Sequence, residues 1–374
     1  MTGKLPRLGR VGAGRSATPP PVRIVHLGLG AFHRAHAAWF TDRAEDGEAW
    51  GIAAFGGRVG GGGGSSLVDR LTAQQGVYTV VTRGPDGDRF EPVGALAAVH
   101  HGGDLDAWCA LLAAPSAALV TLTVTEAGYL VGPDGHPDPG HPAVAADVAA
   151  LRAGRPAELT TGGGRLVAGL AARARAGHPP LALVPCDNRP ANGEVVRNLV
   201  VDVAGAVDVG LGRDIAGAFE AVSTVVDRIT PGFDPAAVDL VSATCGWSDE
   251  APVVTEPWAE WVLAGTFPGG RPNWEVTRPL PGTTAGPVND AAAVTVLADP
   301  VSITGYEARK LFLLNGAHSL LAYLGSIRGH ATVAQAFADP AVRSVVDRWW
   351  AEAAPTTGQS PEAVIAAWVT RPAS

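Results

Sequence analysis

A short segment near residue 310 carries four side chains that can hold or move protons. Within the otherwise apolar run 306–319 lie Glu307, Lys310, Asn315 and His318. In an α-helix, at about 100° per residue, the four fit within roughly 140° of one face. A lysine among leucines is costly while charged, which favours the neutral amine that can accept a proton. The alternative is a solvated helix edge with an ion pair between Glu307 and Lys310, three residues apart.

A second group with possible chemistry lies near the start of the chain. Residues 22–27 predict a strand, and a glycine turn and a helix follow. Gly28 permits a tight turn, and Gly30 lets the backbone approach a pyrophosphate at a helix N-terminus. His33 replaces the third glycine of the usual dinucleotide fingerprint. Two glycines also occur in many ordinary turns, so the pattern alone leaves both interpretations open.

Polar residues also follow an apolar run at residues 180–185. Asp187 and Asn188 come directly after this predicted strand. Groups just past the carboxyl end of a parallel strand lie where open α/β sheets bind ligands. Turn formation and helix capping explain the same residue types equally well.

The elements that must position these groups form an alternating series. Apolar strands at 22–27, 51–55, 118–125 and 180–185 alternate with alanine- and glycine-rich helical stretches at 140–154, 162–177 and 193–209. This alternation predicts an α/β fold with a Rossmann-type, doubly wound parallel sheet. We expect a flexible leader at 1–21, a dinucleotide-binding domain at 22–295 and a mainly α-helical domain at 296–374.

Composition narrows the class of protein. The net charge of −8 argues against a nucleic-acid partner, and no apolar run reaches the length of a membrane span. Three widely spaced cysteines (Cys109, Cys186 and Cys245) predict neither a disulfide framework nor a zinc site. The expected compartment is the cytoplasm.

Several segments, taken in order, resemble the polyol-specific long-chain dehydrogenases, the mannitol 2-dehydrogenase family that also holds fructuronate and tagaturonate reductases. The segments are HLGLGAFHRAH (26–36), TLTVTEAGY (121–129), PCDNRPANGEVVRN (185–198), STVVDRITP (223–231) and YEARKLFLLNGAHSLLAYLG (306–325). The resemblance implies a zinc-independent, NAD(P)-linked alcohol dehydrogenase with a Rossmann-type domain and a helical C-terminal domain.

The resemblance also implies roles for individual residues. Lys310 matches the family's general base, while Asn188 and Asn315 match the pair that hydrogen-bonds the reacting oxygen. His318 matches a substrate-orienting group. Glu307 matches a carboxylate that passes the proton to solvent.

Binding residues follow from the same resemblance. Asp227 matches an acid of the substrate pocket. Gly28, Gly30, Phe32 and His33 fall on the dinucleotide-binding turn.

The reaction expected from the resemblance interconverts a polyol and its ketose, of the mannitol/fructose type. The alternative substrate pair is mannonate and fructuronate, and the alternative of another class is an inactive nucleotide-binding remnant. NAD is the expected cofactor. NADP is possible, because the family's ribose-binding acid aligns with the glycine run near Gly64, and the next acid is Asp69.

Family members usually continue beyond the point where this sequence stops, and an arginine in that later part contacts substrate. We therefore expect an incomplete helical domain. The family resemblance implies a monomer, but exposed apolar surface in the C-terminal part could drive association. This surface is an apolar stripe that comprises Val333, Phe337, Val342, Val345, Val346, Trp349 and Trp350.

Overall fold

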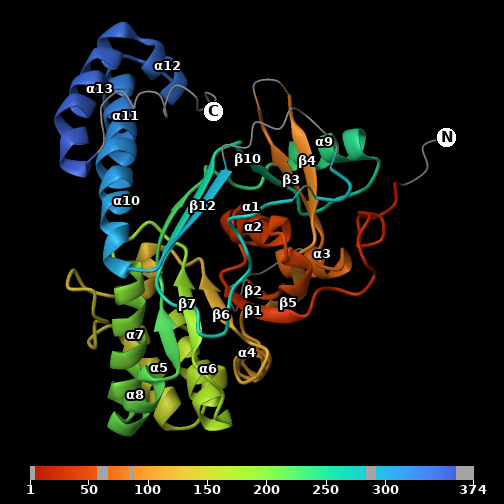
Figure 1. The fold of residues 1–374 in the computed structure, drawn as a ribbon, viewed down its shortest axis with the longest axis vertical. Helices are drawn as coiled ribbons and strands as arrows, with labels where there is room; N and C mark the ends of the chain where they lie inside the picture. Colours follow the sequence, from red (N-terminus) through yellow and green to blue (C-terminus); the bar gives the residue numbers. More distant parts are fainter. Residues whose placement is uncertain (1–4, 57–65, 85–86, 279, 284–291, 359–374) are drawn as a thin grey trace.

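The central element of the molecule is a six-stranded parallel sheet. The computed structural model describes residues 5–56, 66–84, 87–278, 280–283 and 292–358 (Figure 1). The strands are β1 (Val22–Leu27), β2 (Gly51–Gly56), β5 (Leu96–His101), β6 (Leu119–Leu122), β7 (Leu181–Pro185) and β8 (Phe219–Ala221). They lie in the order β5-β2-β1-β6-β7-β8, and every neighbouring pair is parallel. This is the dinucleotide-binding order, so the predicted Rossmann-type sheet is confirmed.

Alternate residues of each strand serve two separate cores. Ile24 and Leu119 face one apolar cluster, whereas their neighbours Val25 and Val120 face the other. The second cluster is covered by α4 (Leu105–Leu112), α5 (Pro142–Arg152), α6 (Gly162–Ala176), α7 (Asn192–Val207) and α8 (Val209–Ala216). The first is covered by α1 (Ala31–Ala35), α2 (Ala37–Arg43) and α3 (Leu67–Ala73). The sheet is therefore wound on both faces, as its apolar strands require.

Two smaller sheets extend this half of the molecule. One consists of β10 (Val253–Thr255), β3 (Tyr78–Thr82) and β4 (Arg89–Val93), with α9 (Pro235–Cys245) nearby. The other consists of β12 (Ala292–Leu297), β11 (Ala259–Ala264) and β9 (Ser223–Asp227). The predicted domain boundary near residue 295 falls inside β12, which pairs in parallel with β11. The helical part of the chain thus begins only after Leu297.

The C-terminal part is helical, as predicted, and stands beside the end of α7 in Figure 1. Its elements are η4 (Pro300–Ile303), α10 (Thr304–Ala308), the π-helix η5 (Arg309–Asn315), α11 (Gly316–Ile327), α12 (Val333–Ala338), α13 (Pro340–Ala353) and η6 (Ala354–Thr357). The predicted apolar stripe is only partly covered: Val333, Phe337, Val345 and Trp349 are half-buried. Val342, Val346 and Trp350 are buried, because α13 packs them against α11 and η5.

The segment expected to be a flexible leader is packed where the structure describes it, from residue 5 onward. Arg15 forms an ion pair of 2.7 Å with the buried Asp42, and the buried Arg10 donates to the Gly94 carbonyl at 3.0 Å. Leu8 is also buried. Arginines in a glycine-rich stretch therefore anchor it through buried hydrogen bonds, a role that composition alone did not reveal.

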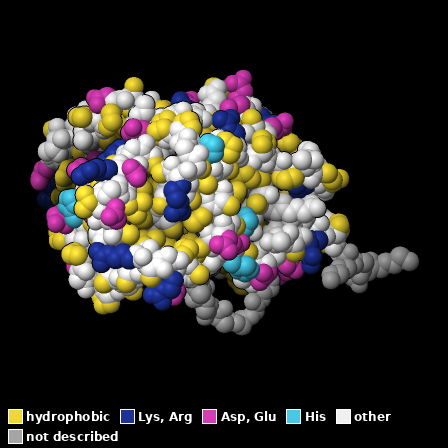
Figure 2. Space-filling view, turned by 90° about the horizontal axis from the view of Figure 1, so that it is seen from below, with side chains coloured by type: hydrophobic (Ala, Val, Ile, Leu, Met, Phe, Trp, Pro, Cys, Tyr) yellow, Lys and Arg dark blue, Asp and Glu magenta, His cyan; other side chains and the backbone are white. Residues whose placement is uncertain are grey.

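The surface is chemically mixed. Figure 2 shows acidic, basic and hydrophobic side chains interspersed over one face of the molecule. Apolar atoms normally contribute much of a folded surface, so scattered exposed leucines do not define a site. Among the described helices, none combines the length and apolar character needed to cross a membrane.

Candidate active site

A cavity of about 480 Å³ opens at the carboxyl ends of β1, β6 and β7. Its walls are Phe32, residues 123–127, residues 186–188 and Val226. Strand order reverses between β1 and β6, and open α/β sheets bind ligands at such a point. The cavity therefore lies where a dinucleotide fold places its cofactor.

The glycine turn borders this region. Gly28 has φ +107°, and a Cβ atom there would lie 2.1 Å from the Thr123 carbonyl oxygen. The N–H groups of Gly28 and Leu29 both donate to the Phe55 carbonyl at 3.1 Å. A Cβ atom at Gly30, by contrast, would have no neighbour closer than 3.8 Å. Gly28 is thus required by the protein itself, whereas the backbone at Gly30 adjoins open space.

His33 lies beneath the turn rather than in the cavity. Its ring is fully buried and stacks on His26 of β1, with ring centroids 3.3 Å apart. The third fingerprint glycine normally allows close packing of helix on strand. Here two flat rings fill that contact instead. Burial lowers the pKa of His26 and of His36 to about 3 and holds that of His33 well below its ordinary value.

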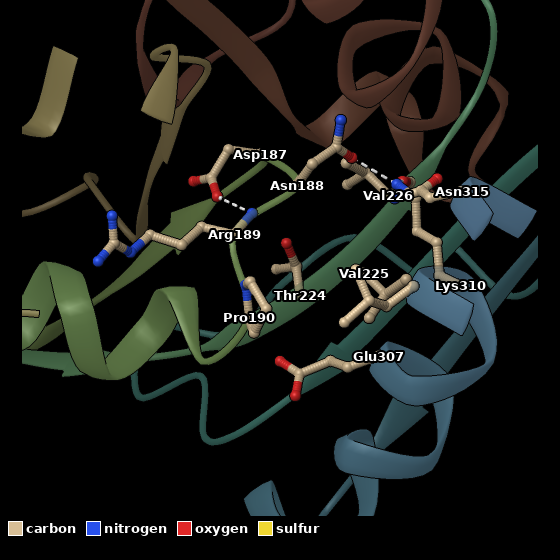
Figure 3. Close-up of a pocket in the computed structure, with 11 residues that line it drawn as sticks. Asp187, Asn188, Arg189, Pro190, Thr224, Val225, Val226, Glu307, Lys310 and Asn315 are labelled. Carbon is tan, nitrogen blue, oxygen red and sulfur yellow. Dashed lines mark hydrogen bonds between the residues drawn. The ribbon is translucent and has the colours of Figure 1, made fainter. Parts of the chain in front are cut away.

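A smaller cavity of about 30 Å³ adjoins the first, and Lys310 forms part of its wall (Figure 3). The two cavities share Asp187, Asn188 and Val226. Asn188, Asn315, Glu307 and Lys310 all line the smaller one. The structure thus brings together four of the five residues expected to be catalytic.

Lys310 is half-buried and held by oxygen atoms of the sheet domain. Its amine donates to Oδ1 of Asn188 and to the carbonyl of Val226 in β9. An ammonium group has donors and no acceptor, so Asn188 must turn its oxygen toward it. Figure 3 shows the amide nitrogen of Asn188 directed away from Lys310. That nitrogen is the end available to a ligand oxygen.

The helix that carries Lys310 is not the regular α-helix expected from the sequence. Residues Arg309–Asn315 form a π-helix, in which each hydrogen bond spans five residues. Lys310 and Asn315, five residues apart, therefore follow one another on the same side. In an α-helix, about 140° would separate them. The π-turn brings the two groups closer around the helix than the predicted α-helix does.

Glu307 joins the helical part to the sheet domain. Its carboxylate accepts a hydrogen bond of 2.8 Å from the N–H of Ala191, the N-cap residue of α7. A carboxylate is favourable at a helix N-terminus because of the partial positive charge there. Capping therefore accounts for this contact, alongside the expected role in proton transfer.

Like Gly28, Gly30 and His33, the two predicted substrate-side residues Asp227 and His318 lie outside both cavity walls. Asp227 follows Val226 on β9, and its carboxylate accepts from Nε1 of Trp258 at 2.9 Å. His318 is half-buried on α11, one turn beyond the π-helix. Neither lines either cavity.

Asp187, which the sequence left open between ligand binding and turn formation, lines both cavities. Its carboxylate accepts from the phenol of Tyr129 at 2.5 Å and from the N–H of Arg189 at 2.8 Å. Burial raises the pKa of the Asp187 carboxyl, and burial and the adjacent Asp187 raise that of Tyr129. Its position directly after β7, beside Asn188, was the available signal.

A second signal for the site was present in the composition. Of the 28 basic residues, 26 are arginine, and the two lysines are Lys4 and Lys310. Arginine cannot lose its proton in a protein, whereas lysine can. In a chain whose basic residues are nearly all arginine, the lysine at position 310 therefore indicates a site that needs a basic group able to lose its proton.

The expected ribose-binding position is only partly described. The glycine run near Gly64 lies outside the described residues. Asp69 forms a capping box with Ser66 at the start of α3 and lies 3.4 Å from Nε2 of His101. Helix capping accounts for Asp69. Among the described residues, no group of three or more histidine, cysteine or acidic side chains is arranged to hold a metal ion.

Comparisons with known proteins agree with this architecture. Residues 22–276 match the mannitol dehydrogenase Rossmann domain, and residues 302–371 match the mannitol dehydrogenase C-terminal domain. The chain is 34% identical to a mannitol 2-dehydrogenase of Cereibacter sphaeroides, covering 87% of this chain and 63% of that protein. It is 32% identical to the D-mannonate oxidoreductase of Escherichia coli K12, covering 86% and 62%. The chain thus spans less than two thirds of the length of these relatives.

A solved structure extends the comparison to three dimensions. The fold is similar to that of a Pseudomonas fluorescens mannitol 2-dehydrogenase in ternary complex with NAD and D-mannitol. The TM-score is 0.76 with 28% sequence identity, covering 95% of this chain and 70% of the other. With both of its halves matched in order, the chain belongs to the mannitol dehydrogenase family.

Proposed function

We propose that this protein is an NAD(P)-dependent, zinc-independent dehydrogenase that interconverts a polyol and its ketose, with Lys310 as the general base. The observation that carries the proposal is the Lys310 amine, held by Asn188 and the Val226 carbonyl beside the cavity at the strand-order reversal. Relatives named mannitol 2-dehydrogenase support the polyol.

The described residues fit a dinucleotide. The open space at Gly30 suits a pyrophosphate beside backbone, and the cavity edged by Phe32 and residues 123–127 suits a flat ring. When bound, the oxidised nicotinamide cofactor accepts the hydride that leaves the carbinol carbon.

The side chains of the smaller cavity supply the remaining chemistry. Oxidation of a secondary alcohol releases its hydroxyl proton, and neutral Lys310 accepts that proton. Negative charge builds up on the substrate oxygen during this transfer, and the amides of Asn188 and Asn315 stabilise it by donating hydrogen bonds. Glu307, which lines the same cavity, passes the proton onward. Asp227 and His318 are proposed to act on more distant parts of the substrate.

The second candidate substrate pair is mannonate and fructuronate. It is favoured by the relative named D-mannonate oxidoreductase, which is nearly as similar as the mannitol enzyme. Rates of cofactor reduction with mannitol, sorbitol, arabinitol and mannonate separate the two. Activity with mannonate alone would transfer the proposal to the sugar acid.

Lys310→Ala tests the general base. Turnover should fall by roughly 10²–10⁴-fold, the usual scale for general acid–base catalysis, while NADH binding stays close to normal. Lys310→Arg should be as inactive, because arginine keeps the charge but cannot deprotonate. Lys4→Arg is the matched control. Near-normal turnover of Lys310→Ala would refute the assignment, and a wild-type chain inactive on all four substrates would favour a nucleotide-binding remnant.

A further inference from the structure

The π-helix that carries Lys310 is held by two tryptophans from α13. Nε1 of Trp349 donates to the Phe312 carbonyl at 2.7 Å, and Nε1 of Trp350 donates to the Leu313 carbonyl at 3.0 Å. A π-turn is rare and often found at functional sites. Breaks in the regular hydrogen-bond ladder have identifiable causes, such as an inserted side chain. Here two successive carbonyls of the π-turn receive an indole N–H from outside the helix.

Gly316 makes the approach of one indole possible. It is the first residue of α11, and its N–H donates to the Leu311 carbonyl, five residues back. A Cβ atom at this position would lie 2.8 Å from Nε1 and Cζ2 of Trp349. The indole therefore lies directly against the end of the π-turn, where a larger residue would push it away.

The contact between Trp349 and the π-turn affects the candidate active site because the π-turn carries two of the residues that line it. Lys310 and Asn315 stand at its two ends, and both line the cavity around the lysine amine. Reversion to regular α-helical hydrogen bonding would rotate Asn315 relative to Lys310. The hydrogen bonds from α13 oppose that change from the side of the helix facing the C-terminal core.

We propose that Trp349 is a positioning residue for the Lys310 site, which it serves by holding the π-turn through its indole N–H. Trp350, which is fully buried, anchors α13 from within the helical core. The inference rests on the proposed function, in which Lys310 and Asn315 act on the same substrate oxygen. Trp349 itself is not among the residues that line the two cavities.

Trp349→Phe keeps an aromatic ring and removes the N–H donor. Turnover should fall by about 10-fold, since displacement of a reacting group by about 1 Å can cost up to ~10²-fold. The dissociation constant of NADH should stay within about twofold of wild type, because that site is formed by the sheet domain. The matched control is Trp108→Phe, which removes a similar indole bond of 2.8 Å, to the Arg165 carbonyl. Its turnover should be unchanged; equal losses of turnover in both variants would overturn the inference.

A second measurement needs no activity. The chain contains only two lysines, Lys4 and Lys310. In a Lys4→Arg variant labelled with ¹³C-lysine, every lysine signal in the NMR spectrum therefore comes from Lys310. Trp349→Phe and Gly316→Ala should both shift the Lys310 Cε resonance. Trp108→Phe and Gly305→Ala should not, since a Cβ atom at Gly305 meets nothing within 4 Å.

The two readouts separate the inference from the proposed function. If the wild-type chain oxidises none of the substrates but the Lys310 resonance moves in Trp349→Phe and Gly316→Ala, the proposed function fails and the positioning contact stands. If the resonance stays in place in both variants, the positioning role is refuted, whatever the wild-type activity.

Discussion

The Lys310 amine lies between two oxygen acceptors, one from a side chain and one from the backbone. Both acceptors belong to the sheet domain, whereas the lysine belongs to the helical part. Because Asn188 presents its oxygen to the amine, its amide N–H group is directed away from the lysine, and in the proposed reaction it faces the substrate oxygen. One carboxamide can thus orient the base and stabilise the charge that develops on the substrate.

Two nearby asparagines, Asn188 in the loop after β7 and Asn192 at the start of α7, provide a test at this scale. Asn188 is exposed, whereas Asn192 is fully buried and exchanges hydrogen bonds with Thr224 at 2.8–3.2 Å. Asn188→Ala should raise the barrier by about 3–4 kcal/mol, the usual cost of losing one preorganised donor, with little effect on stability. Asn192→Ala should instead lower the free energy of unfolding by about 1–3 kcal/mol. Steady-state kinetics and urea unfolding distinguish them; a purely structural effect of Asn188→Ala would favour the turn interpretation.

The sequence allowed part of the site to be predicted at the level of residues. Lys310, Asn188, Asn315 and Glu307 have polar groups in apolar or strand-end contexts, and these do meet around one cavity. His33 lies elsewhere because ring stacking on His26 fills a contact that the motif assigns to glycine. That exchange depends on two side chains from different elements, which local sequence does not connect.

At the scale of elements, the segment from β1 to the start of α2 carries three buried histidines. His26, His33 and His36 are fully buried, and burial holds each pKa below its ordinary value. Each ring is thus kept neutral in the folded chain, whereas the unfolded chain protonates it below about pH 6.5. The free energy of unfolding is therefore highest above pH 6.5. It decreases as the pH falls toward about 3, which is the pKa of His26 and His36 in the folded protein.

Unfolding should therefore be strongly acid-dependent. Between pH 6.5 and pH 3 each histidine removes at most about 1.4 kcal/mol of stability per pH unit. Urea unfolding followed from pH 7.5 to pH 4.5 measures this slope, and His33→Phe should reduce it. A free energy of unfolding that stays level over this range would show that the three rings accept protons in the folded state.

Regular strands and helices were easier to predict than the π-helix and the packed segment at residues 5–21. Strands β1, β2, β6 and β7 follow from apolar runs, and α5, α6 and α7 from alanine-rich stretches between them. The π-helix was not predictable, because the indole N–H groups that donate to its carbonyls come from α13, 37 residues further along the chain. The packing of residues 5–21 was missed for a similar reason: its arginines find partners more than 25 residues away.

At the scale of the whole molecule, Glu307 links the two parts of the chain by capping α7. Glu307→Gln keeps an oxygen acceptor for the Ala191 N–H but cannot carry a proton. It should retain most of the stability and lose turnover if the carboxylate serves proton transfer. Glu307→Ala should also destabilise the protein by about 0.5–2 kcal/mol, as loss of a cap does. Full turnover in Glu307→Gln would limit the residue to capping.

The contacts of Lys310 also have a consequence for the order of folding. They join residues separated by 122 positions, to Asn188, and by 84 positions, to Val226. Such long loops close slowly, and local helices form well before them. After dilution from urea, helical circular dichroism should therefore recover first and turnover last. If the two signals returned together, the lysine pocket would have to form in the same step as the helices around it.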